Sequence, residues 1–207
     1  MTALVQTTAP DFLAKAVMPD GEVHDLRLSD YRGKYVVLFF YPLDFSFVCP
    51  TEIVAFSTRI RDFEQRNVQL TGVSVDSQFA HFAWGKMPRS AGGLGDVSYP
   101  LIADLSRSIS HSFGVLITEG FALRGLFLID RDGIVRYQVI NDLPLGRSVD
   151  EMLRMVDALQ FFEENGELCP ANWHPGDKSI DPAEDNSCEF FASEYKEISA
   201  SDETNLE

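Results

Sequence analysis

The chain has 207 residues, of which 45% are hydrophobic, and its 17 Lys and Arg against 32 Asp and Glu give a formal net charge of −15. This apolar content is enough for a packed core and excludes a disordered chain. The acidic balance argues against nucleic acid and against an anionic membrane surface as partners, because both are bound by clustered basic side chains.

The first predicted elements are a hairpin and a buried strand. Residues 11–17 and 22–28 have the pattern of short strands, and the Pro and Gly between them suit a tight turn. Residues 34–41 are a continuous apolar run rich in Val and Phe, which is typical of a strand buried on both faces. Pro42 ends this run.

A helix over residues 49–66 follows. Pro50 suits its first turn, and apolar residues repeat at spacings of three and four, as expected for a buried helix face. These residues are Ile53, Phe56, Ile60 and Phe63. The pattern then predicts a strand over 68–75, a helix over 77–87 and a Gly-rich loop over 92–95.

The second half of the chain adds a hairpin between two helices. The expected elements are a short helix over 106–113, strands over 123–129 and 134–140, and an amphipathic helix over 148–165. Asp132 and Gly133 supply a strong hairpin signal between the two strands. Ser148 and Glu151 form a capping box for the last helix, and Gly166 is its stop signal.

This order of elements predicts an α/β fold with a mixed central sheet flanked by helices and with an N-terminal hairpin. The composition changes near the end: residues 177–207 hold ten acidic residues against two lysines, which is −8 of the −15. We expect a domain over residues 1–165 and a C-terminal extension over residues 166–207 that wraps on the domain and ends in an acidic tail.

The sequence predicts neither a membrane span nor a secretory signal. The most apolar run, at residues 35–43, is far shorter than the roughly 20 residues that a span requires. The first eight residues lack a charged region followed by a long apolar one. We therefore expect the protein in the cytoplasm or an equivalent reducing compartment.

The three cysteines are Cys49, Cys169 and Cys188. They are too few for a disulfide scaffold, and no two of them have the spacing of a zinc site or of a C-x-x-C redox pair. We expect no metal and no cofactor. The thiols are then either catalytic or buried without chemistry.

Cys49 has a context that favours reactivity. It follows a buried strand and a short loop and opens a helix, where unpaired N–H groups and the helix dipole favour the thiolate. Ser46 is placed to offer a hydroxyl to a substrate or to the sulfur, and Pro42 to shield the sulfur from water. The residues alone leave open an inert cysteine at a helix start, with Ser46 as an ordinary loop hydroxyl.

Several motifs resemble those of a known family. Pro42, Ser46 and Cys49 match the peroxiredoxin signature P-x-x-x-[T/S]-x-x-C, and the string F-x-F-V-C-P-T-E is similar to the typical two-cysteine subgroup. The family usually has Thr in place of Ser46, which keeps the hydroxyl on a stiffer side chain. Further matching motifs follow in the family's order at residues 76–84, 124–130, 141–148 and 167–173.

The resemblance implies a thioredoxin-like fold and the reduction of hydroperoxides. It implies that Cys49 is the peroxidatic cysteine, which passes through a sulfenic acid, and that Arg124 supports its thiolate and holds the peroxide oxygens. Glu52 and Arg147 match a charged group that orients this arginine. Without the motif match, a strand-end surface charge for Arg124 and ordinary surface ion pairs for Glu52 and Arg147 are the alternatives.

The resemblance also implies a reaction partner and an assembly. Cys169 matches the resolving cysteine, which forms an intersubunit disulfide with Cys49, and thioredoxin or a thioredoxin-like protein then restores the thiols. Homodimers that assemble into decamers are expected, whereas Cys188 has no catalytic counterpart. Two alternative functions remain, an oligomeric holdase chaperone and a redox relay that oxidises a partner protein.

Overall fold

The computed structural model describes residues 3–195, and these residues fall into two compact units. The first unit ends at Leu153 and the second begins at Arg154. The end of the acidic tail, residues 196–207, lies outside the described residues.

Seven strands of the first unit form one sheet in the order β2-β1-β5-β4-β3-β6-β7. The strands are β1 (Leu13–Val17), β2 (Val23–Arg27), β3 (Tyr35–Phe40), β4 (Val68–Ser74), β5 (Leu101–Ala103), β6 (Arg124–Ile129) and β7 (Val135–Asn141). β3 pairs in parallel with β4 and antiparallel with β6. The predicted mixed sheet is confirmed.

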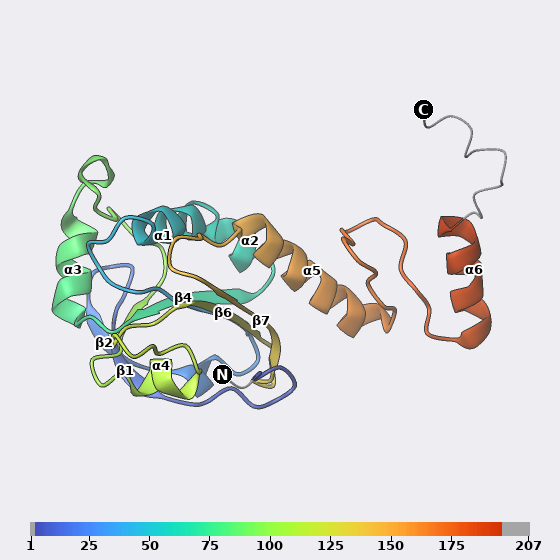
Figure 1. Ribbon diagram of the computed structural model, residues 1–207, viewed down its shortest axis with the longest axis horizontal. Helices are drawn as coiled ribbons and strands as arrows, with labels where there is room; N and C mark the ends of the chain where they lie inside the picture. The colour runs from blue at the N-terminus through green and yellow to red at the C-terminus, as the bar shows by residue number, and fades with distance from the viewer. Residues whose placement is uncertain (1–2, 196–207) are drawn as a thin grey trace. The chain divides into compact units, whose positions relative to one another are not determined.

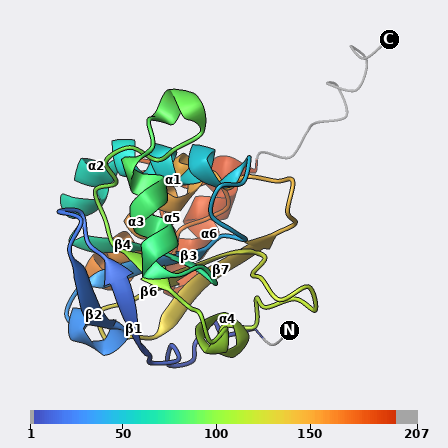
Figure 2. The same ribbon diagram turned by 90° about the vertical axis from the view of Figure 1, so that its left-hand side faces the viewer.

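Six α-helices accompany the sheet in the described part of the chain. They are α1 (Cys49–Thr58), α2 (Ile60–Glu64), α3 (Gln78–Lys86), α4 (Ser108–Ser112), α5 (Val149–Asn165) and α6 (Glu184–Glu194). In the first unit, α1 and α2 cover one face of the sheet and α4 covers the other (Figure 1, Figure 2). α3 lies on the side of α1, because its Trp84 packs against Tyr41 at the end of β3. α5 begins in the first unit and continues into the second.

The centre of the core is β3, whose six residues are all buried. Val36, Leu38 and Phe40 belong to the apolar cluster on one face of the sheet. On the other face, Phe39 stacks on Phe56 of α1 with the ring centroids 5.0 Å apart. The prediction of a strand buried on both faces is confirmed, and this strand leads directly into the loop before Cys49.

The predicted turns and caps are also confirmed. β1 and β2 form the N-terminal hairpin, with Gly21 at φ +86° in its turn, and Gly133 at φ +77° turns β6 into β7. At the start of α5, the Ser148 hydroxyl accepts a hydrogen bond from the Glu151 N–H at 3.2 Å. Gly166, at φ +74°, follows the end of α5.

Periodicity overlooked a break in one predicted helix and missed two elements, β5 and α6. The helix expected over residues 49–66 is broken at Arg59, because the Thr58 hydroxyl binds the Ala55 carbonyl and the Arg59 N–H turns to Phe56 instead. β5 has only three residues, which is too short to show a repeat. The prediction also missed α6, whose acidic sequence has no clear apolar stripe.

The Gly-rich loop at residues 92–95 folds tightly onto the end of α3. Trp84 donates its indole N–H to the Gly92 carbonyl at 2.9 Å, and the Gly95 N–H binds the Met87 carbonyl at 3.0 Å. A Cβ on Gly93 would overlap the backbone carbonyl of Met87, so this position requires glycine. The loop is therefore fixed by its backbone.

We expect Gly93→Ala to lower the free energy of unfolding of the reduced protein by about 1–3 kcal/mol, because the added methyl group must displace the Met87 backbone. Urea denaturation measures this change. Gly92→Asn is the matched control, since Gly92 has open space around it and Asn tolerates its φ of +78°. Equal stabilities of Gly93→Ala and the wild type would contradict the proposed close contact.

Candidate active site

Cys49 is the first residue of α1, and its side chain is buried. The loop that leaves β3 brings the chain to this helix start, with Pro50 in the first turn. The N–H groups of Thr51 and Glu52 bond back to the Val48 carbonyl, which closes the first turn behind the sulfur. Cys49 thus occupies the helix start that the sequence predicted.

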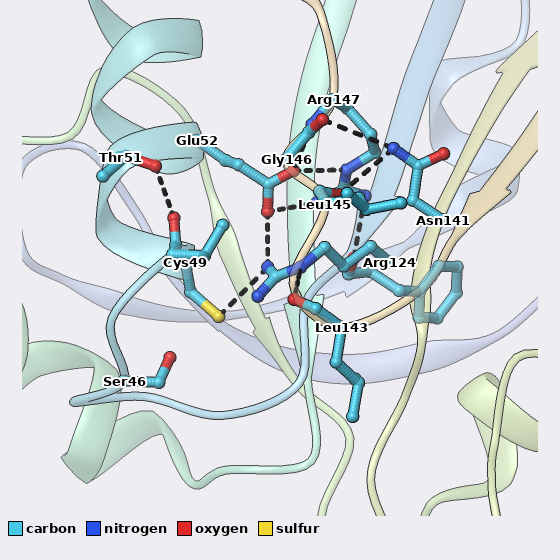
Figure 3. A network of polar contacts seen from close by, with 12 residues as sticks. Ser46, Cys49, Thr51, Glu52, Arg124, Asn141, Leu143, Leu145, Gly146 and Arg147 are labelled. Atoms are coloured by element: carbon cyan, nitrogen blue, oxygen red, sulfur yellow. Dashed lines mark hydrogen bonds and ion pairs between the residues drawn. The ribbon is translucent and has the colours of Figure 1, made fainter.

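Arg124, the first residue of β6, points its guanidinium at this sulfur (Figure 3). Its Nη1 lies 3.4 Å from Cys49 Sγ and 2.7 Å from Glu52 Oε2, and its Nε donates to the Leu143 carbonyl at 2.6 Å. The residue is only 3% exposed, which excludes a surface charge at a strand end. Three acceptors therefore hold the guanidinium in one orientation.

Arg147 holds Glu52 from the other side. Its Nε and Nη2 donate to the two carboxylate oxygens at 2.7 and 3.0 Å, and its backbone N–H adds a third bond at 2.8 Å. Its Nη1 also binds the carbonyls of Phe40 on β3 and Gly125 on β6. Glu52 and Arg147 are both buried, so they form an internal network and not a surface ion pair.

The network carries more positive than negative charge. Burial by itself raises the pKa of Glu52, but the hydrogen bonds and charges of Arg147 and Arg124 outweigh it and hold the pKa below its usual value. One carboxylate thus faces two guanidinium groups in a site of low polarity. The Arg124 guanidinium brings this excess positive charge to within 3.4 Å of the Cys49 sulfur.

Ser46 and Pro42 precede Cys49 in the loop from β3. The Ser46 hydroxyl donates to the Leu43 carbonyl at 2.7 Å, so its proton is directed at the loop backbone and not at the sulfur. The hydroxyl oxygen keeps acceptor capacity for a substrate proton. Pro42 is buried two residues after the end of β3.

Cys169 and Cys188 belong to the second unit, so the structure assembles the site around Cys49 from the first unit alone. The Cys169 thiol lies 3.5 Å from the Ala158 carbonyl of α5, and burial raises its pKa. Cys188 is exposed on α6, and all three cysteines are free thiols.

Sequence reasoning missed the backbone acceptors and one buried polar cluster. The carbonyls of Leu143, Phe40 and Gly125 left no signal, because any residue supplies a carbonyl. Below the loop before Cys49, His81 Nδ1 lies 2.8 Å from Asp44 Oδ2. Both side chains are buried, and burial raises the pKa of Asp44. The only sequence feature that could have indicated this cluster is the polar character of Asp44 and His81.

Comparison with known proteins places the chain in a family. Residues 5–138 match the AhpC/TSA family, and residues 158–193 match the C-terminal domain of 1-Cys peroxiredoxin. Peroxiredoxin-2 of Cricetulus griseus is 59% identical over 185 residues, which cover 89% of this chain and 93% of that protein. Peroxiredoxin-1 of Gallus gallus is 56% identical over 191 residues, which cover 92% and 96%.

Solved structures agree with this assignment. The reduced 2-Cys peroxiredoxin of Plasmodium vivax superposes with a TM-score of 0.90 at 44% identity, covering 92% of this chain and all of that one. The predicted thioredoxin-like fold is thereby confirmed. A buried thiol beside a fixed guanidinium at a helix start, on this fold, defines a thiol-dependent peroxidase.

The chain belongs to the peroxiredoxin family, as a typical two-cysteine member. It is an antioxidant enzyme that reduces hydroperoxides with a cysteine thiol, and these findings favour the peroxidase over the holdase and relay alternatives. Of the helices in residues 3–195, none combines the length and the apolar character that crossing a bilayer requires. The same residues contain no group of three potential metal ligands.

Proposed function

We propose that Cys49 is the peroxidatic residue of this enzyme. Its thiolate attacks one oxygen of a hydroperoxide, the S–O bond forms as the O–O bond breaks, and the leaving alkoxide or hydroxide takes up a proton. Cys49 becomes a sulfenic acid, and the products are an alcohol or water. The observation that carries this proposal is the 3.4 Å contact between Cys49 Sγ and the buried Arg124 guanidinium.

Arg124 acts at two stages of this step. Before the reaction its fixed charge stabilises the thiolate, and during the reaction it stabilises the charge that develops on the leaving oxygen. Glu52 and Arg147 orient it, since Glu52 binds both guanidinium groups. Ser46 accepts a hydrogen bond from the peroxide, and Pro42 excludes water from the same loop.

The sulfenic acid is then resolved by Cys169 of the partner subunit. The Cys49 side chain is 0% exposed at the start of α1, so a disulfide requires the first turn of this helix to open. Thioredoxin or a thioredoxin-like protein then reduces the disulfide by thiol exchange. This recycling requires a reducing compartment, which supports a cytoplasmic location.

The assembly that we propose is a homodimer that associates into decamers. Four aromatic side chains around the loop before Cys49 and on α3 are exposed in the single chain. They are Phe45, Phe47, Phe79 and Phe82. An apolar group of this kind on a surface is typical of an interface between subunits. Sedimentation of the reduced protein measures the size of the assembly.

The test of the site is a non-reducing gel after treatment of the reduced protein with one equivalent of hydrogen peroxide. We expect a covalent dimer for the wild type and none for Cys49→Ser or Cys169→Ser. Cys188→Ser is the matched control and retains the dimer, because Cys188 is exposed on α6 and has no role in the proposed cycle. A dimer that persists in Cys49→Ser would overturn the assignment.

A further inference from the structure

The resting Cys169 thiol is held in its neutral form. Its sulfur lies 3.5 Å from the Ala158 carbonyl, an acceptor that only the protonated thiol can serve. Burial raises the pKa of the thiol, and the charge of Arg154 acts in the opposite direction. The thiolate is the nucleophile in disulfide formation, so this environment slows the attack of Cys169 unless a cation supports the ionised sulfur.

Arg154 lies one helical turn before Ala158 on α5, and its guanidinium binds the loop that carries Cys169. Its Nη1 donates to the Trp173 carbonyl at 3.1 Å. Trp173 is 2% exposed, and its ring packs on Phe161 of α5 with the centroids 4.7 Å apart. The loop over residues 169–173 is therefore fastened to α5 at both ends, and the guanidinium is fixed on the helix face that Cys169 touches.

We propose that Arg154 is a positioning residue for the resolving step. It holds the loop that carries Cys169, and its positive charge stabilises the Cys169 thiolate when the thiol loses its proton. This inference rests on the role of Cys169 proposed above. Arg154, Ala158, Cys169 and Trp173 all belong to the second unit. The proposal therefore assigns to the second unit a cation that serves Cys169 as Arg124 serves Cys49.

The step that this cation assists is the condensation of two sulfurs. The Cys169 thiolate attacks the sulfur of the Cys49 sulfenic acid, the S–S bond forms, and the S–O bond breaks. Hydroxide leaves and takes up the proton that Cys169 gave up, which makes water. Both electrons of the new bond come from Cys169, so the step needs no further reductant.

The acidic residues of the neighbouring segments are Asp157, Glu167 and Asp177. Asp157 is next to Ala158 on α5, and Glu167 accepts a hydrogen bond from the Ser179 hydroxyl. Asp177 accepts the His174 N–H at 2.8 Å. Arg154 is the charged group that lowers the pKa of Cys169. The experiment therefore tests whether the positive charge of Arg154 is required for the reaction of Cys169.

The experiment separates charge from fastening with two variants, Arg154→Met and Arg154→Lys. Stopped-flow fluorescence follows oxidation of Cys49 and disulfide formation as two phases after mixing with peroxide, between pH 6 and 10. In Arg154→Met we expect the second phase to slow about threefold at pH 7 and its pH midpoint to rise by about half a unit, since the thiolate fraction changes tenfold per pKa unit. In Arg154→Lys the midpoint stays at the wild-type value.

The first phase is expected to be unchanged in both variants, because Arg154 and Cys49 belong to different units. Arg61→Met, which removes an exposed arginine of α2, is the matched control for both phases. Equal pH midpoints in the wild type and in Arg154→Met would overturn the proposal. Loss of the second phase in Cys169→Ser tests the role of Cys169 by itself, so the two proposals fail separately.

Discussion

Replacing Arg124 by Met is expected to lower the rate constant for the reaction of the reduced protein with hydrogen peroxide about 10²–10³-fold. Removal of one fixed donor from a site of developing negative charge has an effect of this size. Met fills much of the same volume but loses the contact with Cys49 Sγ and the bond to Leu143. Stopped-flow measurement of tryptophan fluorescence under excess peroxide gives the rate constant.

The fold is expected to survive this change. Glu52 remains bound by Arg147 through both carboxylate oxygens, so no buried charge is left without a partner. Arg136→Met is the matched control: it removes an arginine from β7 that pairs with Asp130, and the rate is expected to stay within about twofold of the wild type. An Arg124→Met variant that reacts as fast as this control would exclude Arg124 from the chemistry.

Glu52→Gln is expected to lower the free energy of unfolding by about 3–5 kcal/mol, the usual effect of removing one partner from a buried ion pair. The amide has nearly the shape of the carboxylate, but it leaves the Arg124 and Arg147 guanidinium groups buried without an anion. Urea denaturation at pH 7 measures the change. A loss below 1 kcal/mol would mean that solvent or another acidic group compensates these arginines.

The same carboxylate predicts a pH dependence of stability. Its pKa in the folded protein is below that of an unfolded glutamate, which is about 4.3. A lowered pKa means that the stabilisation is complete above the unfolded value and is lost as the pH falls through the folded value. We therefore expect Glu52→Gln to be less sensitive to acid below about pH 4 than the wild type. Glu64→Gln, at an exposed position of α2, is expected to retain the wild-type acid sensitivity.

The sequence was most informative where local chemistry decides the structure. Gly21 and Gly133 marked turns that need a positive φ, Ser148 marked a helix cap, and the apolar run before Pro42 marked the central strand. Cys49 was located by the same reasoning, because a strand, a short loop and a helix start follow each other there. Each of these features depends on a few neighbouring residues, so it can be predicted from the local sequence without knowing the fold.

Contacts between distant parts of the chain could not be predicted in this way. Glu52 and Arg147 are 95 residues apart, and nothing in the residues around either one shows that they meet. The family motif was needed to connect them, as it was for Arg124 and Cys49. The pairing of Asp44 with His81 stayed hidden for the same reason, since it forms only when the loop after β3 folds against α3.

Arg147 joins three elements through one side chain: it binds β3 at Phe40, β6 at Gly125 and α1 at Glu52. Because one side chain makes all these contacts, any loosening between β3 and β6 also disturbs the charges beside Cys49. We therefore expect the rate constant for the reaction of Cys49 with peroxide to fall when the packing of β3 against β6 is weakened.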